Sequence, residues 1–225
     1  MEMLVRSLLI VIVIASVGLG HSLVHAGNQP NVVFIITDDQ GYGDLSCYGN
    51  PVLKTPALDR LYEQSNRLED YHVNPTCSPT RGALHSGHSA NRAGTWSTTM
   101  GRSLIREGEM TLGQVFQDSG YKTGMFGKWH LGDNYPFRAE DRGFDEVVRH
   151  GGGGVGQTPD YWDNAYFNDT YYHNGKPTQY EGYCTDIFFA EAKRFIKEAS
   201  ASDQPFFAYI STNAPHSPWH CPEKY

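Results

Sequence analysis

Residues 31–39 have the sequence NVVFIITDD, and this segment constrains the arrangement of the rest of the chain. Its first seven residues form a nearly continuous run of β-branched and aromatic side chains, and two adjacent carboxylates follow. Such a run is typical of a strand that is buried on both faces. The segment therefore predicts a central strand in a sheet that helices cover on each side.

Helical and strand patterns alternate along the remaining chain. The expected helices begin at Thr55-Pro56, Ser78, Thr111 and Thr185, and the expected strands cover residues 67–73, 121–126 and 205–211. In the first of these helices, Leu58, Leu61 and Tyr62 are expected on the inward face. The alternation predicts an α/β fold with a layered, mixed and mainly parallel β-sheet flanked by helices.

A glycine-rich tract from about residue 148 to residue 182 is expected to form a long surface excursion. Gly151, Gly153 and Gly156 have the G-x-G-x-x-G spacing of a dinucleotide site. However, the sequence QTPD at residues 157–160 is poorly suited to open the helix that such a site requires. A flexible loop is the better interpretation of this motif.

The first 26 residues have the pattern of a secretory signal peptide. Arg6 precedes an apolar run from Leu8 to Val17, and Val24-His25-Ala26 fits the small-residue rule at a cleavage point. The run is short for a membrane span. We therefore expect a mature chain of residues 27–225 that is secreted or periplasmic, with no membrane span. An uncleaved N-terminal anchor is the alternative.

Composition and charge limit the classes of partner. The formal net charge is −7 and no basic run occurs, which argues against nucleic acid. The 13% aromatic and 19% charged residues indicate a folded domain rather than disorder. Export permits disulfides. If Cys77 has a chemical role, at most one bridge can form among Cys47, Cys184 and Cys221, and no bridge at all is equally compatible with the sequence.

Polar clusters follow four of the expected strands. They are Asp38-Asp39, the segment 74–77 (NPTC), the segment 128–130 (KWH) and the segment 213–216 (NAPH). Ligands of open α/β sheets bind beyond the carboxyl ends of the strands. Four clusters at equivalent positions therefore predict one binding pocket.

Asp38 and Asp39 are candidate metal ligands. Adjacent carboxylates repel each other unless a cation lies between them, and Gly41 and Gly43 allow the backbone to turn there. Ca²⁺ and Mg²⁺ prefer oxygen ligands but take six or more, so two aspartates cannot complete the shell. The alternative is a helix cap and turn pair.

Cys77 and Arg81 are candidate anion-binding residues, because Cys77 is expected at the start of a helix and Arg81 one turn later. A thiolate with a lowered pKa is one functional interpretation. The alternative is a buried thiol with Arg81 in a surface salt bridge.

Three further residues suit anion binding and proton transfer. Lys128 and His130 are two apart and share a face of an extended segment. His216 lies between Pro215 and Ser217-Pro218, which favours a fixed imidazole. The same prolines make a helical zinc pair with His220 implausible. The remaining histidines singled out here, His85, His88, His150 and His173, are expected to be surface or packing residues.

Four motifs together resemble those of the sulfatase family, in the alkaline-phosphatase-like superfamily. In chain order they are TDDQGYGDLSCYGNP (37–51), CSPTRGALHSG (77–87), GKWHLG (127–132) and NAPHSPW (213–219). They span almost the whole mature chain. The chain contains no G-x-S-x-G elbow, C-x-x-C pair or phosphate-binding P-loop.

The resemblance implies a chemistry for the signature cysteine. A maturation enzyme would oxidise Cys77 to formylglycine (3-oxoalanine), which hydrates to a diol. One hydroxyl group would attack the sulfur of a sulfate ester, and the second would allow the sulfate to be expelled. A serine has no second hydroxyl group and could not complete the cycle.

The resemblance also implies roles for the neighbouring residues. Asp38, Asp39 and the modified Cys77 would bind Ca²⁺, with Mg²⁺ less favoured. Arg81 would hold the modified side chain. Lys128 would bind the sulfate. His130 would orient or deprotonate the second hydroxyl group. His216 would contact the sulfate and help to protonate the leaving group.

Members of this family are considerably longer than 225 residues, with a further Asp-Asn metal pair, a second lysine and a smaller C-terminal subdomain. We therefore expect residues 27–225 to be an incomplete N-terminal catalytic region. Such a fragment would bind calcium weakly, hydrolyse little and expose sheet edges.

The resemblance makes a sulfuric ester hydrolase that acts on an aryl or carbohydrate sulfate the leading hypothesis. Two alternatives to it remain. One is a phosphodiester or phosphonate ester hydrolase of the same superfamily. The other is a non-catalytic relative that binds anions or glycans.

Overall fold

The computed structural model describes residues 29–99 and 102–225. The expected signal peptide, residues 1–26, lies outside the described residues. Across the described ranges, the structure has no helix that is both long and apolar enough to cross a membrane.

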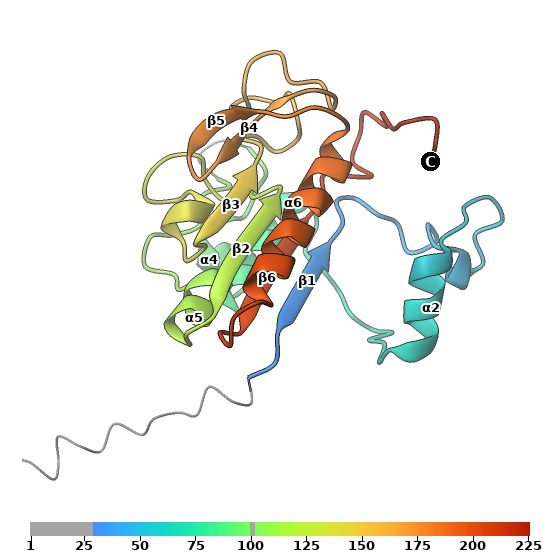
Figure 1. The fold of residues 1–225 in the computed structure, drawn as a ribbon, viewed down its shortest axis with the longest axis horizontal. Coiled ribbons are helices and arrows are strands. Elements are labelled where there is room, and N and C mark those ends of the chain that lie inside the picture. The colour runs from blue at the N-terminus through green and yellow to red at the C-terminus, as the bar shows by residue number, and fades with distance from the viewer. Residues whose placement is uncertain (1–28, 100–101) are drawn as a thin grey trace, which may run out of the picture.

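A mixed six-stranded sheet forms the centre of the structure (Figure 1). Its strands in chain order are β1 (Val32–Ile36), β2 (Lys122–Gly127), β3 (Glu146–Arg149), β4 (Thr170–His173), β5 (Lys176–Gln179) and β6 (Phe206–Ser211). Their order across the sheet is β1-β6-β2-β3-β4-β5. The first four of these are parallel, and β4 and β5 add an antiparallel hairpin. The predicted mixed and mainly parallel sheet is confirmed.

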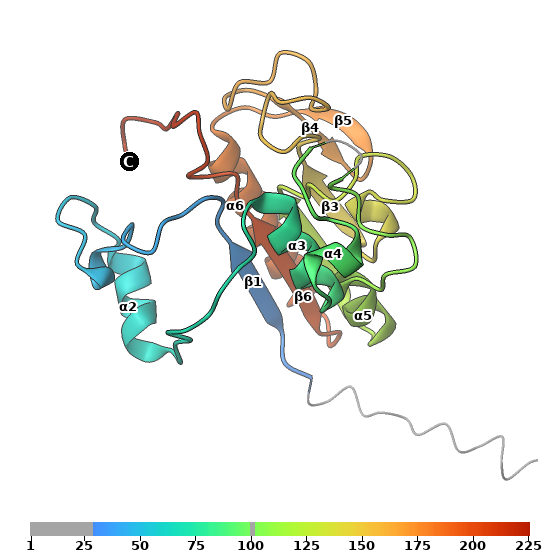
Figure 2. The same cartoon turned by 180° about the vertical axis from the view of Figure 1, so that it is seen from behind.

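Helices α3 (Cys77–Ser86), α4 (Ala90–Ala93), α5 (Leu112–Asp118) and α6 (Cys184–Ala199) cover the two faces of this sheet. Helix α2 (Pro56–Gln64) lies away from the sheet, and short 3-10 turns occur at Ser46–Tyr48 and Ala139–Asp141. Helix α6 packs on β2 and β6 from one side, with Phe188 and Phe195 fully buried. Helices α3, α4 and α5 lie on the other side, over a core that includes Trp129 and Tyr209 (Figure 2). The α/β layered class is therefore confirmed.

Strand β1 departs from the expectation of burial on both faces. It pairs with β6 at the end of the sheet, in the register Val32↔Phe207. Val33 is 47% exposed and Ile35 is 54% exposed, whereas Phe34 packs against the core. The predicted central position is wrong because β1 pairs with β6 alone among the described strands. One face of β1 stays exposed because α6 packs on β2 and β6.

The segment between β1 and α3 was also predicted incorrectly in part. Helix α2 begins at Pro56 as expected, but Leu58 and Leu61 are exposed, because α2 packs on the 3-10 turn at Ser46–Tyr48 and stands away from the sheet (Figure 1). Residues 67–73 form no strand; Leu68 and Tyr71 are largely exposed in an irregular connection. A β-like pattern needs a pairing strand, and this segment has none in the described chain.

The tract from residue 148 to residue 182 is not only a surface excursion. It contains the β4–β5 hairpin and contributes the buried side chains of Val155, Tyr166 and Tyr171 to the core around α6. Bends and turns, rather than a helix, follow the G-x-G-x-x-G motif. The four cysteines, all within the described residues, are unpaired.

Candidate active site

The carboxyl ends of β1, β2 and β6 meet at one edge of the sheet, where main-chain hydrogen bonds continue beyond the strands. The Lys128 amide donates to the Ser211 carbonyl oxygen at 2.7 Å, and the Asp38 amide donates to the Ala214 carbonyl oxygen at 3.1 Å. Gly127 has φ 112, and a Cβ atom there would lie 1.9 Å from the Ser211 carbonyl oxygen. Only glycine permits this close approach, which fixes Lys128 beside the end of β6.

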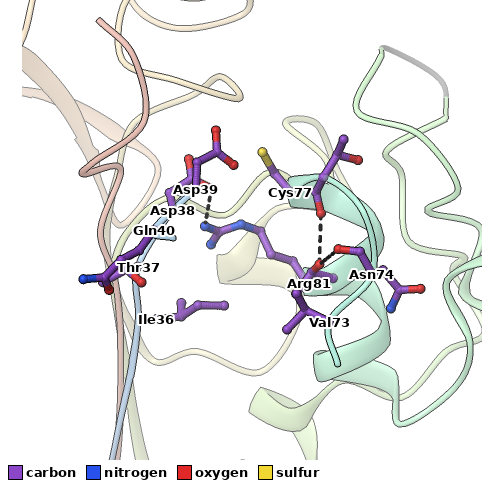
Figure 3. Close-up of a pocket in the computed structure, with 11 residues that line it drawn as sticks. Ile36, Thr37, Asp38, Asp39, Gln40, Val73, Asn74, Cys77 and Arg81 are labelled. Carbon is purple, nitrogen blue, oxygen red and sulfur yellow. Dashed lines mark hydrogen bonds and ion pairs between the residues drawn. The ribbon is translucent and has the colours of Figure 1, made fainter. Parts of the chain in front are cut away.

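Helix α3 brings Cys77 and Arg81 to this edge, one turn apart. Both line a cavity of about 280 Å³ together with Asp38, Asp39 and Thr76. Figure 3 shows the Arg81 side chain crossing from α3 toward Asp38, with the Cys77 sulfur and the Asp39 carboxylate on the same side of the cavity. The structure thus joins the first two predicted clusters.

Three non-glycine residues at this edge have left-handed backbone conformations. Asp39 has φ 61, Thr76 has φ 69 and His130 has φ 55. Such conformations cost about 1–3 kcal/mol each, and the cost is greatest for a β-branched residue such as Thr76. Thr76 lies directly before Cys77, the first residue of α3.

A buried ion cluster forms the base of the cavity. Lys128 Nζ donates to Asp38 Oδ2 at 2.5 Å, and Arg81 Nη2 donates to Asp38 Oδ1 at 3.2 Å. All three side chains are at most 3% exposed. Burial raises the pKa of Asp38, but the charges of Arg81 and Lys128 outweigh burial and hold this pKa below its ordinary value. Two cations share one carboxylate here, so the cluster has an excess positive charge.

The environment of Cys77 does not favour a thiolate. Burial raises the pKa of the Cys77 thiol, and the nearby charge of Asp38 adds to this effect. The charges of Lys128 and Arg81 act in the opposite direction without cancelling it. The interpretation as a thiolate with a lowered pKa is therefore wrong, and so is a surface salt bridge for Arg81, which is buried against Asp38.

Asp38, Cys77 and His216 each place one candidate ligand atom within 4.8 Å of the others. Asp39 joins this group through His216, whose Nε2 lies 3.6 Å from Asp39 Oδ2. A hard cation such as Ca²⁺ fits the two carboxylates, but neither a thiol nor an imidazole is a preferred calcium ligand. The two carboxylates are fewer than the six or more oxygen ligands that such a cation takes.

His130 lies at the border between this edge and a second cavity. Its carbonyl oxygen accepts a hydrogen bond from Ser78 at 2.8 Å, and its Nε2 lies 3.2 Å from the Thr98 carbonyl oxygen. Burial and then the charges of Lys128 and Arg81 lower the pKa of His130 to about 4. The imidazole is neutral near pH 7 and able to accept a proton at Nδ1 if Nε2 donates to Thr98.

Polar residues to which the sequence analysis gave no individual role also lie near this edge. Ser211, at the end of β6, is fully buried and hydrogen-bonded to Arg81 Nη1. Ser78 holds the chain at His130, and Asn213 Oδ1 accepts a hydrogen bond from Cys184 at 3.4 Å. A polar residue at the last position of an otherwise apolar strand was the available signal for Ser211.

The fold and this edge of the sheet define an α/β protein with a cationic pocket beside a cysteine. A family model for sulfatases matches residues 30–225, and the chain belongs to the sulfatase family. It is 32% identical to an arylsulfatase of Klebsiella aerogenes over 89% of this chain and 46% of the relative. It is 31% identical to an N-acetylgalactosamine-6-sulfatase of Canis lupus familiaris over 93% of this chain and 44% of the relative.

Solved structures of other proteins have a similar fold. The Ps i-CgsB structure in complex with k-i-k-neocarrahexaose matches with a TM-score of 0.77 and 27% identity, over 88% of this chain and 48% of that chain. BT4656 in complex with its substrate D-glucosamine-2-N,6-O-disulfate matches with a TM-score of 0.72 and 27% identity, over 86% and 36%. The chain spans somewhat less than half the length of these relatives.

Proposed function

We propose that this protein is a sulfuric ester hydrolase whose reacting centre forms at Cys77. The observation that carries the proposal is the buried pair of cations, Arg81 and Lys128, which shares the single carboxylate of Asp38 beside Cys77. An anionic ester would neutralise the excess charge of this cluster, and charged hydrogen-bond donors stabilise tetrahedral oxyanions.

Conversion of Cys77 to formylglycine is part of this proposal. The raised pKa leaves the unmodified thiol protonated and weakly nucleophilic near neutral pH. The hydrated aldehyde would supply two hydroxyl groups on one carbon, one for attack on sulfur and one for release of the product. We propose that a formylglycine-generating enzyme makes this change and that the protein is exported through residues 1–26.

The chain's own residues then bind the ester and move protons. Lys128 would bind the sulfate oxygens, and Arg81 would hold the side chain at position 77 against Asp38. His130, whose lowered pKa keeps the imidazole neutral near pH 7, would orient or deprotonate the second hydroxyl group. His216 lies beside Cys77 and would contact the sulfate and protonate the leaving oxygen.

Asp38 and Asp39 would hold Ca²⁺, which would supply positive charge for the anionic ester; Mg²⁺ is the less favoured ion. The carboxylates and the modified side chain at position 77 provide oxygen atoms of the kind that Ca²⁺ prefers. In the structure Asp38 pairs with Lys128, so this carboxylate would serve both the ion and the ammonium group that binds the sulfate.

The first experiment is mass spectrometry of the peptide that contains Cys77, after co-expression with a formylglycine-generating enzyme. The proposal expects a peptide lighter than the cysteine form, and an unmodified thiol would overturn it. Turnover is then compared on 4-nitrophenyl sulfate and 4-nitrophenyl phosphate, with C77A as the inactive control. Faster phosphate than sulfate hydrolysis would favour the phosphoester alternative.

A further inference from the structure

The glycine-rich segment of residues 151–156 has no role in the chemistry proposed above, yet it lies against one of the residues that take part. The second cavity, of about 410 Å³, is lined by His130 and by the first three glycines of this segment. His130 follows the end of β2, and the glycines follow the end of β3. These two strands are parallel neighbours in a register that pairs Gly127 with Arg149, so the two segments leave the sheet side by side.

The backbone of His130 is in a strained conformation. Its φ of 55 lies in the left-handed region, which is unfavourable for a residue with a side chain. Such conformations persist only where the surrounding structure holds them. Ser78, which is fully buried on α3, donates from its hydroxyl group to the His130 carbonyl oxygen at 2.8 Å. This hydrogen bond ties the turn at His130 to α3.

The Thr98 carbonyl oxygen selects which nitrogen of the imidazole carries the proton. His130 Nε2 lies 3.2 Å from this oxygen, which can only accept, so the hydrogen bond requires a proton on Nε2. Burial lowers the pKa of His130 to about 4, so the ring is neutral near pH 7 and has a single N–H group. Nδ1 therefore keeps its lone pair, and within the described chain this buried atom has no hydrogen-bond partner.

Gly153 is in direct contact with the same ring. A Cβ atom at position 153 would lie 2.6 Å from Cε1, 2.7 Å from Nε2 and 3.2 Å from Nδ1 of His130. Carbon atoms in contact lie about 3.5–4.0 Å apart, so even the methyl group of alanine does not fit here. The ring cannot turn away without losing the hydrogen bond from Nε2 to Thr98.

The loop that contains Gly153 is itself anchored. Asp160 accepts hydrogen bonds from the amides of Gly151 and Gly156, both at 2.7 Å, and so closes the loop. Val155 is 4% exposed and packs in the core around α6. A side chain at position 153 would therefore have to displace the His130 ring or break these contacts.

We propose that Gly153 is a positioning residue for His130. The absence of a side chain lets the anchored loop close on the imidazole, while Thr98 keeps the proton on Nε2 and leaves Nδ1 as the proton acceptor. The use of His130 as a base rests on the proposed function, but the contact that holds its ring does not. The glycine-rich motif thus serves a side chain of the site rather than a dinucleotide.

A double-mutant cycle in urea denaturation tests the contact without turnover. In the full chain, Gly153→Ala should lower the urea midpoint, and in a His130→Ala background, where the ring is absent, it should lower the midpoint much less. Failure of Gly153→Ala to fold counts as the full loss. Gly108→Ala is the matched control, because a Cβ atom there meets no atom within 4 Å, and it should not lower the midpoint in either background. Equal losses from Gly153→Ala in both backgrounds, or no loss in either, overturn the proposal.

NMR of the isotope-labelled wild-type chain tests the same contact without any substitution. Near pH 7 the ¹⁵N shifts of His130 should report a neutral ring with its proton on Nε2, as the bond to Thr98 requires. The ring proton on Cε1 should show a nuclear Overhauser effect to the Hα protons of Gly153. A proton on Nδ1, or no such effect to Gly153, overturns the proposal.

Hydrolysis by the matured protein separates this proposal from the proposed function. Gly153→Ala should lower kcat for 4-nitrophenyl sulfate about tenfold with little change in KM, because a displaced base affects proton transfer more than binding of the ester. Gly108→Ala should change neither. A wild-type protein that shows the contact but cleaves no ester contradicts the proposed function and retains the contact. Hydrolysis with an unchanged kcat in Gly153→Ala contradicts the positioning role alone.

Discussion

Replacing His85 by phenylalanine removes a base that lies in an aromatic cluster on the inner face of α3. The His85 ring is 2% exposed and makes edge contacts with Trp129 and Tyr209, both with ring centroids at 4.8 Å. Burial, and then the charge of Arg81 one turn earlier, lowers the pKa of His85 from 6.5 to about 3. Phenylalanine keeps the aromatic packing and cannot take up a proton.

The sign of the effect follows from the two pKa values. Between about pH 6.5 and about pH 3 the unfolded chain binds a proton at His85 and the folded chain does not. Acid therefore favours unfolding. Each pH unit below 6.5 removes about 1.4 kcal/mol, so lowering the pH to about 5 removes about 2 kcal/mol through this residue.

Urea denaturation, followed by tryptophan fluorescence at several pH values, measures this loss. His85→Phe should lose about 2 kcal/mol less than the wild type between about pH 7.5 and about pH 5. Because only the pH dependence is compared, a packing change that alters the free energy of unfolding equally at both pH values cancels. His72→Gln is the control, because the His72 side chain is 86% exposed and should leave the slope unchanged. Parallel pH curves for wild type and His85→Phe would refute the reasoning.

Three further predictions concern stability. Asp38→Asn leaves two buried cations without a counter-charge and should cost about 3–5 kcal/mol in urea denaturation; a loss below about 1 kcal/mol would contradict the buried ion cluster. Thr111→Ala removes the capping box of α5 and should cost about 1 kcal/mol, whereas an unchanged midpoint would show that the cap is not needed. Gly82→Ala places a Cβ atom 1.9 Å from Thr95 Oγ1 and should lower Tm, and Thr95→Gly should restore part of it; no rescue would place the strain elsewhere.

Local patterns predicted much of the fold. Helix α5 has both a cap and an apolar face, and β6 is a continuous apolar run, so both were found within one or two residues. The wrong predictions concern which strands pair and which strand faces are covered by helices. The strand expected at residues 67–73 has no pairing strand, and β1 is exposed on one face, because pairing and coverage depend on distant segments. The short, polar β5 has no pattern of its own and depends on β4.

The positions of the site residues were predictable because they follow strands and the start of α3. The interactions among them were not. That Asp38 lies between two cations depends on how β1, β2 and α3 pack, and the same packing raises the pKa of Cys77 rather than lowering it. The left-handed turn at His130, which directs this residue to the second cavity, also has no local sequence signal.

The contact of Gly127 with the end of β6 has a consequence for engineering. The ends of these two strands touch through backbone atoms, so variation at Gly127 would drive β2 and β6 apart and displace Lys128. The loops at residues 133–135 and 157–162 have no comparable restriction at their exposed side chains. Directed evolution of ligand preference is therefore best confined to libraries in these two loops, with the strand ends kept constant.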